Sequence, residues 1–252
     1  MGELKLKTED VNTTTSDLPG MGGWAESFLR RFSNFGFAFF LLPLMLVCCF
    51  CVGAAAAPGL WLMDYVSAAT ADWLAPWHYL ALGCALSTGY LMYGLLLIFI
   101  VPAFNFLMPI KPKPFRGPWY SLGAIPWYIH NALTYVVRYT FLEFLTPTPM
   151  NILFYRMMGM KIGKGVVINS TAISDPCMIT LEDYVTVGGS ATIFAHYGQK
   201  GYLIIAPVTI GKGTNIGLKA SVMGGAKVGA GVTIKPHICV LPKTVIPDGE
   251  TV

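Results

Sequence analysis

The sequence contains 252 residues, of which 54% are hydrophobic and only 12% are charged. A charged share roughly half that of an ordinary soluble domain indicates that part of the chain lies in a bilayer rather than in water. The net charge of +4 comes from scattered basic residues, which argues against a nucleic-acid-binding surface, and the six cysteines indicate neither a disulfide framework nor the paired C-x-x-C spacing of a zinc knuckle.

Residues 1–23 are rich in Thr, Asp and Gly and show neither the period of a helix nor that of a strand. A polar segment of this kind cannot bury enough apolar surface to offset the entropy of ordering the chain. We therefore expect a disordered cytoplasmic tail.

Two uncharged runs, residues 35–57 and 77–101, lie in a predicted membrane region that spans residues 24–150. Each run is long enough to cross a hydrocarbon core of about 30 Å as a helix, and the second has aromatic residues near one end, as interfacial anchoring favours. The alternative for the first run is a cleaved signal peptide, but Arg30 and Arg31 lie too deep in the chain and the apolar run is too long. Both runs are predicted to be transmembrane helices.

The charges around these runs predict their orientation. The connecting segment has two aspartates and no Lys or Arg, whereas basic residues flank the pair of runs (Arg30, Arg31, Lys111, Lys113 and Arg116). The positive-inside rule places both termini in the cytoplasm.

Residues 119–146 are rich in aromatic residues but include His130, Arg138 and Glu143, which a lipid-exposed helix centre tolerates poorly. We expect an interfacial or re-entrant helix rather than a third span. At such a depth, His130 is expected to contact water or lipid headgroups rather than to carry out chemistry.

The strongest pattern is a repeat in residues 151–252. From Ile210 onward an aliphatic residue recurs at every sixth position (Ile210, Ile216, Val222, Val228, Ile234, Val240, Ile246 and Val252). Neither an amphipathic helix nor an ordinary strand has this period. The same phase occurs earlier at five positions (Ile162, Ile168, Leu181, Val187 and Ile193), and residues 175–180 and 194–203 interrupt it.

A six-residue step with one inward aliphatic side chain describes one side of a triangular prism, so three steps make one coil. Glycine directly follows Ile210, Ile216 and Val228, at positions where the lack of a side chain relieves crowding. Residues 162–252 thus resemble the hexapeptide-repeat superfamily, which implies a homotrimer and an all-β, left-handed parallel β-helix, here preceded by an α-helical membrane region. The left-handed coil is an exception to the usual right-handed crossover and comes from the resemblance alone.

A second resemblance, over residue 111 to the end of the chain, is to the membrane-embedded terminal region of nonribosomal peptide synthetases of the poly-lysine-synthetase type. Four segments carry it: PFRGPWY, TPTP-x5-YRMMGMKIGKGVVI at 146–168, SDPCMIT at 174–180 and LEDYVTVGGSATIFAHYG at 181–198. The adenylation and carrier domains of those synthetases are absent from this sequence, so their peptide-forming chemistry is not carried over as a whole.

Most hexapeptide-repeat proteins are acyltransferases that use acyl-coenzyme A, a reaction that requires a base and an oxyanion donor. His196 resembles the catalytic histidine of related acetyltransferases, which lies beside a loop that reaches the neighbouring subunit; otherwise it caps a turn or packs at a trimer seam. Asp175 either orients His196, binds an acceptor amine, or simply forms an Asp-Pro turn with Pro176.

The same resemblance implies a coenzyme A site. The backbone N–H of Leu218, after Gly217, corresponds to the oxyanion donor, and three lysines are candidates for the coenzyme phosphates (Lys219, Lys235 and Lys243). These lysines could equally form a solvated corner. The segment Lys235–Pro236–His237 departs from the small residues that the family often has beside the pantetheine arm, and proline offers no N–H.

His237 raises a metal-binding alternative, since relatives of the carbonic anhydrase type bind zinc through three histidines across a subunit boundary. His196 and His237 supply only two ligands and no H-x4-H spacing occurs, so no metal is expected.

The main hypothesis is an acyltransferase with two membrane spans, in a bacterial inner membrane, that transfers an acyl group from a coenzyme A or other thioester to a hydroxyl or amine of a lipid-linked or otherwise membrane-associated acceptor. The first alternative is a non-catalytic trimeric scaffold that docks partners at the membrane. The second is a metal-dependent hydratase.

Overall fold

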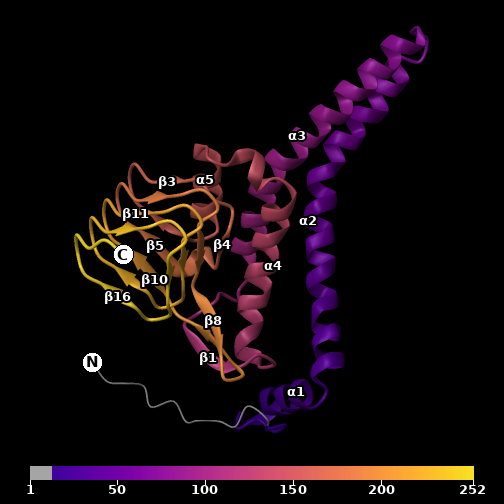
Figure 1. The fold of residues 1–252 in the computed structure, drawn as a ribbon. Coiled ribbons are helices and arrows are strands. Elements are labelled where there is room, and N and C mark those ends of the chain that lie inside the picture. The colour runs from indigo at the N-terminus through magenta and orange to yellow at the C-terminus, as the bar shows by residue number, and fades with distance from the viewer. Residues whose placement is uncertain (1–12) are drawn as a thin grey trace.

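The computed structural model describes residues 13–252, so residues 1–12 of the predicted tail lie outside the described residues. Helix α1 (Gly20–Arg31) begins inside the predicted tail, which makes residues 20–23 helical. A long helical hairpin follows and projects away from a strand-built body at the C-terminal end of the chain (Figure 1).

The hairpin consists of α2 (Ser33–Ala69) and α3 (Ala75–Leu107), which are longer than the two predicted runs. Segments Leu41–Ala69 and Ala75–Leu107 are long and apolar enough to span a membrane. At about 1.5 Å per residue, α2 is close to 55 Å long and exceeds a hydrocarbon core of about 30 Å. It contains two prolines (Pro43 and Pro58) and bends along its length, as internal prolines cause helices to do (Figure 1).

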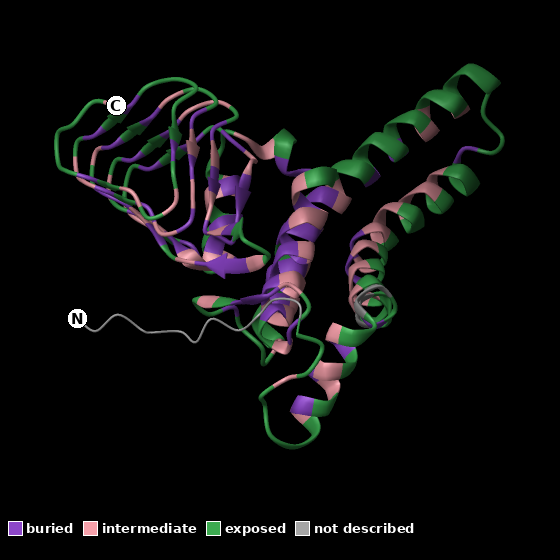
Figure 2. Cartoon of the chain, turned by 60° about the horizontal axis from the view of Figure 1, so that its bottom comes forward, coloured by how far each residue is buried: buried purple, intermediate pink, exposed green. Residues whose placement is uncertain are grey.

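Helix α4 (Ile125–Thr140) lies between the hairpin and the strand-built body, flanked by the short 3₁₀ helices η1 (Leu122–Ala124) and η2 (Leu142–Leu145). It is shorter than the predicted residues 119–146, and much of it is buried (Figure 2). The prediction for His130 is therefore wrong: this side chain is 2% exposed, and its Nδ1 lies 3.1 Å from Asn105 Oδ1 of α3. Because α4 packs on both sides, its polar face meets protein rather than headgroups.

The strand-built body is a parallel β-helix with three faces. The first face contains β2 (Lys161–Ile162), β5 (Ile179–Leu181), β10 (Val208–Ile210), β13 (Lys227–Val228) and β16 (Val245–Ile246). The second contains β3 (Val167–Ile168), β6 (Thr186–Val187), β11 (Asn215–Ile216) and β14 (Thr233–Ile234). The third contains β4 (Ile173–Ser174), β7 (Thr192–Phe194), β12 (Ser221–Val222) and β15 (Cys239–Val240). The handedness of the coil stays a prediction.

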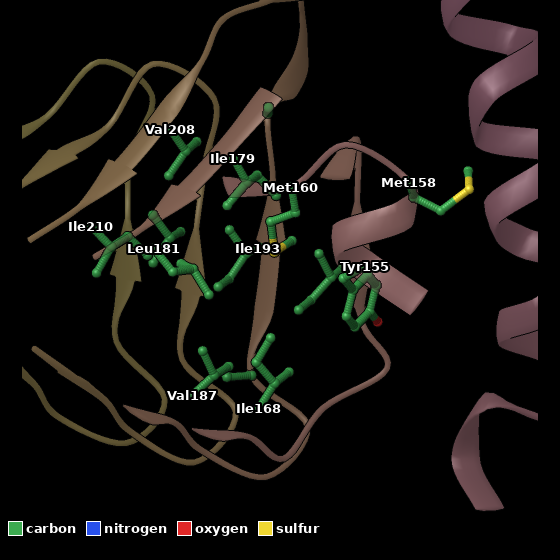
Figure 3. Close-up of a cluster of buried hydrophobic side chains, with 14 of the residues drawn as sticks. Tyr155, Met158, Met160, Ile168, Ile179, Leu181, Val187, Ile193, Val208 and Ile210 are labelled. Carbon is green, nitrogen blue, oxygen red and sulfur yellow. The ribbon is translucent and has the colours of Figure 1, made fainter. Parts of the chain in front are cut away.

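The six-residue period sets the register of this β-helix. Ile210 pairs with Val228 and Val228 with Ile246, so stacked partners are 18 residues apart, which equals three steps of six. Side chains at the repeat positions point into the prism (Figure 3), and all but Ile162 and Val252, at its two ends, are almost fully buried. Each such Val or Ile contributes roughly 1.5–3 kcal/mol relative to an exposed side chain.

Helix α5 (Pro149–Met157) caps the first coil with Phe154 and Tyr155, both fully buried. The hydroxyl oxygen of Thr148 accepts a hydrogen bond from the Met150 N–H and so caps the start of this helix.

Both predicted interruptions of the period are present. The first contains η3 (Pro176–Met178). The second is a hairpin of β8 (His196–Gln199) and β9 (Tyr202–Ile205), and β9 also pairs antiparallel with β1 (Phe115–Pro118). The hairpin turn, Lys200–Gly201, has φ of 51° and 80°, as a two-residue turn that matches the strand twist requires. Strand β1, which precedes α4, is thereby held against the β8–β9 hairpin.

Candidate active site

The candidate site lies where the third face of the β-helix turns into the first. We call this edge the His196 corner: the turns that follow β4, β7, β12 and β15. Successive coils bring Asp175, His196, Gly224 and Lys243 to it. A backbone hydrogen bond of 3.1 Å from the Lys243 N–H to the Gly224 oxygen holds two of these turns in register. A side chain on Gly224 would meet the backbone of Ala195 and His196 at about 3.0 Å, so the glycine permits the coils to stack closely here.

His196 and Asp175 form a hydrogen-bonded pair, with 2.6 Å between His196 Nδ1 and Asp175 Oδ2. The Asp175 side chain is 1% exposed and that of His196 is 21% exposed. Since the bond uses Nδ1, Nε2 is the ring nitrogen that can take up a proton from a bound molecule. The interruption at residues 175–180 places Asp175 in the left-handed region, with φ of 60°, at the start of η3.

Three further donors hold the Asp175 carboxylate. Oδ1 accepts hydrogen bonds from Trp127 Nε1 at 2.7 Å and from Asn131 Nδ2 at 2.8 Å, and Oδ2 accepts one from the Ala195 N–H at 2.9 Å. Burial alone would raise the pKa of Asp175, but the bonds and charge of His196, together with Asn131 and Trp127, outweigh burial and hold this pKa below its usual range. The carboxylate is therefore ionised at neutral pH and favours the Nδ1–H tautomer of His196.

His196 opens into a pocket of about 670 Å³. The wall combines the His196 corner with the β8–β9 hairpin and the segment before α4, and it includes Trp119, Phe194, Met223, Leu241 and Lys243. The Trp127 ring stands edge-on to the imidazole, with 4.8 Å between ring centroids. Aromatic walls of this kind exclude water from one side of the imidazole while the other side stays accessible.

The structure brings only part of the predicted site together. Asp175, His196 and Lys243 lie at the His196 corner, but the other predicted coenzyme-binding residues lie at the next corner, in the turns after β11 and β14 (Gly217, Leu218, Lys219 and Lys235). His237 is also at that second corner, where its N–H donates to the Leu218 oxygen at 2.9 Å. Within one chain the two predicted halves are therefore apart, and coenzyme binding at the second corner stays a prediction.

Catalysis by a cysteine nucleophile and catalysis by a metal ion are two alternatives to consider at this site. Burial, followed by the nearby Asp175 charge, raises the pKa of Cys177 to about 12, so this thiol stays protonated at neutral pH and is a poor nucleophile. Among residues 13–252, no three His, Cys, Asp or Glu side chains are grouped closely enough to hold a metal ion.

Trp127 and Asn131 were not predicted from the sequence as site residues. They are four positions apart, so the sequence alone indicates that they lie on one face of α4. The sequence does not indicate that they contact Asp175, because Asp175 lies 44 residues beyond Asn131 and meets it only through the packing of α4 against the first coil.

Comparisons with known proteins found similarities in sequence and in structure. No family model matches the chain. Delta-poly-L-ornithine synthetase of Acinetobacter baumannii (strain AB307-0294) is 23% identical over 191 residues, which cover 71% of this chain and 14% of that protein. The chain thus spans about a seventh of the length of the curated relative it matches.

Among solved structures, the chain is similar to a serine acetyltransferase of Neisseria gonorrhoeae, with 19% identity, a TM-score of 0.32 and coverage of 51% of this chain and 52% of that one. It is also similar to a maltose O-acetyltransferase from Clostridium difficile 630, with 15% identity, a TM-score of 0.35 and coverage of 53% and 88%.

Proposed function

We propose that this protein is a membrane-anchored acyltransferase, which moves an acyl group from coenzyme A or another thioester to a hydroxyl or amine of a membrane-associated acceptor. The observation that carries the proposal is the pair of His196 and Asp175 at the wall of a 670 Å³ pocket. A buried, ionised carboxylate behind a partly exposed imidazole is the arrangement that a general base at neutral pH requires.

This geometry supports acyl transfer by general-base catalysis. His196 Nε2 takes the proton of the acceptor O–H or N–H as the acceptor's lone pair attacks the thioester carbonyl carbon. The imidazolium that forms is stabilised by Asp175 at 2.6 Å. The tetrahedral intermediate then collapses, the carbon–sulfur bond breaks, and the proton on Nε2 passes to the departing thiolate. Histidine is regenerated and a free thiol and an ester or amide are released.

The donor site is proposed to form between copies of the chain in a homotrimer. Lys243 lies in the His196 pocket and binds a coenzyme phosphate there. Lys219 and Lys235, at the second corner of one copy, bind the coenzyme in the His196 pocket of a neighbouring copy. The Leu218 N–H of the first copy donates to the oxyanion in that pocket. This arrangement is supported by the separation of the two corners within one chain and by the exposure of Leu218, which is 49% exposed.

A membrane-associated acceptor is supported by the two helices that are long and apolar enough to span a bilayer. Among acceptors, an amine is favoured by the similarity to a protein named for joining ornithine, although that similarity covers only 14% of the relative.

The test is thioester consumption by the purified protein with a membrane extract. We expect His196→Ala to lower the rate on the order of a hundredfold, the contribution of a general base. The matched control is His78→Ala, which removes a histidine beside Thr70 at the α2–α3 connection, outside the His196 pocket, and should retain the wild-type rate. Equal rates for wild type and His196→Ala would exclude the proposed base.

A further inference from the structure

A second cavity, of about 310 Å³, lies between α2 and α4. One wall is Leu41, Leu44 and Val47 of α2; the other includes Ile125 and Ile129 of α4. Both sets of residues recur at helical spacing, so two apolar helix faces meet there without filling the space between them. The lining is almost entirely carbon, which suits a hydrocarbon rather than water.

The position of this cavity points to lipid as the source of its occupant. Its α2 wall is the first part of Leu41–Ala69, the segment able to span a membrane. On the same turns of α2, Leu42, Met45 and Leu46 are 60%, 63% and 64% exposed. A helix with an exposed apolar side and a cavity on its other side adjoins both the bilayer and the protein interior.

The cavity adjoins the His196 pocket, since Trp119 lines both. Trp119 stands edge-on to Trp127 at 5.9 Å, and Trp127 stands edge-on to His196 at 4.8 Å. Trp119 is therefore the wall that a molecule with its apolar tail in the cavity must pass to present its polar end to the imidazole.

We propose that the cavity between α2 and α4 binds the hydrocarbon tail of the acceptor, so that the acceptor is an amphipathic molecule with its hydroxyl or amine at His196. This inference rests on the proposed function and names its substrate class. The tail belongs to the acceptor rather than to the donor, because a coenzyme-borne acyl group arrives from water through the His196 pocket. With about 30 Å³ for a group the size of water, the cavity holds on the order of ten carbon atoms.

The experiment uses the full chain in lipid nanodiscs, with acetyl-coenzyme A as the donor and with butylamine, decylamine, butanol and decanol as acceptors. The wild type should prefer decyl to butyl acceptors, since each buried methylene adds to binding. Leu44→Trp fills the cavity and should reduce this preference about tenfold or more, with butyl turnover unchanged. Leu42→Trp is the matched control, because it adds the same side chain on the exposed side of α2 and should retain the wild-type preference.

An unchanged decyl preference in Leu44→Trp would overturn the inference, as would equal losses for butyl and decyl acceptors in a folded variant. A direct binding measurement separates this inference from the proposed function. A decylamine with a photoreactive diazirine at the end of its chain should cross-link to residues 41–47 and 119–129 of the wild type, and less to Leu44→Trp. Cross-linking there without turnover of any acceptor would contradict the proposed function alone, and turnover without cross-linking there would contradict the tail site alone.

Discussion

At the scale of single residues, Asp175 combines nearly complete burial with four hydrogen-bond donors. In Asp175→Asn, one carboxylate oxygen is replaced by an NH₂ group, which can only donate. In one orientation this NH₂ faces the donors of Trp127 and Asn131, and in the other it faces those of Ala195 and His196. Both orientations therefore place donors against donors. We expect acyl transfer to fall on the order of a hundredfold or more, because His196 loses the acceptor that sets its tautomer. The measurement is the initial rate of thioester consumption.

The matched control for this change is Asp183→Asn. Asp183 Oδ1 accepts a hydrogen bond from the Lys164 N–H at 2.7 Å at another corner of the prism, so the same substitution there tests the general cost of losing a turn carboxylate. Equal activity losses in the two variants would mean that Asp175 acts only through the stability of the coil.

His130 gives a prediction about pH and stability. Burial lowers the pKa of His130 to about 4. The charge of Asp175 opposes this shift, and the charge of Lys111 adds to it. Between about pH 6.5 and pH 4 the unfolded chain gains a proton at this histidine and the folded chain does not, so the free energy of unfolding decreases as the pH falls through this range. The full effect is about 3 kcal/mol.

His130→Gln removes the titrating group and keeps a side chain that can bond to Asn105. Thermal unfolding of the protein in nanodiscs at pH 7 and pH 4.5 should show a smaller loss of stability in this variant than in the wild type. The same pH dependence in both proteins would assign the acid sensitivity to other groups.

At the scale of secondary-structure elements, α4 connects the helical hairpin to the proposed catalytic pair. Trp127→Phe keeps an aromatic ring in the packed position but removes the N–H that Asp175 accepts at 2.7 Å. Loss of one donor raises the pKa of Asp175 toward its ordinary value. We expect the acidic limb of the pH–rate profile to move to higher pH and kcat to fall several-fold, with KM unchanged.

Trp77→Phe serves as the control for that variant, since Trp77 is 60% exposed near the start of α3. A packing role for Trp127 alone would lower stability without moving the acidic limb, so an unmoved limb argues against a positioning role for this residue.

The contact between α2 and α3 depends on two glycines. A Cβ on Gly59 would lie 2.9 Å from the Gly89 Cα, whereas a Cβ on Gly53 would meet nothing within 4 Å. Alanine favours helix over glycine by up to about 1 kcal/mol. Gly53→Ala should therefore leave the stability unchanged or raise it, and Gly59→Ala should lower it, because the two backbones must separate.

Stability in nanodiscs, measured as the temperature of unfolding, compares these two substitutions directly. Since the chemical change is identical, propensity cancels from the comparison. A Gly59→Ala protein as stable as Gly53→Ala would show that the helices adjust without cost.

At the scale of the whole molecule, the features that follow a local period could be predicted and those made by distant contacts could not. The aliphatic positions every six residues predicted the inward side chains, and both breaks in the period are present as η3 and the β8–β9 hairpin. The pairing of β1 with β9, about 90 residues apart, has no local signal. The prediction that His130 contacts water or headgroups failed for the same reason, because the burial of His130 depends on the packing of α4 against α3 and the first coil.

The candidate site divides in the same way. His196 and Asp175 could be found because each lies in a break of the repeat, where a side chain is free to leave the coil. Trp127 and Asn131 could not be assigned, since the residue they contact is identified only once α4 is packed. The candidate pair could thus be predicted from breaks in the β-helix repeat, whereas the α4 side chains that contact it could not.

The orientation in the membrane is the last prediction, and it follows from charge. Residues 58–76, which include the connection between α2 and α3, contain Asp64 and Asp72 and lack Lys and Arg, whereas basic residues flank the hairpin. Moving basic residues away from an anionic cytoplasmic surface is unfavourable, so the connection should face outward and the β-helix inward. In a variant without the six native cysteines, Ala71→Cys should react with a membrane-impermeant maleimide in intact cells, and Thr251→Cys only after lysis. Labelling of Thr251→Cys in intact cells would place the proposed active site on the side that lacks coenzyme A, and the acyl donor would then have to be a different thioester.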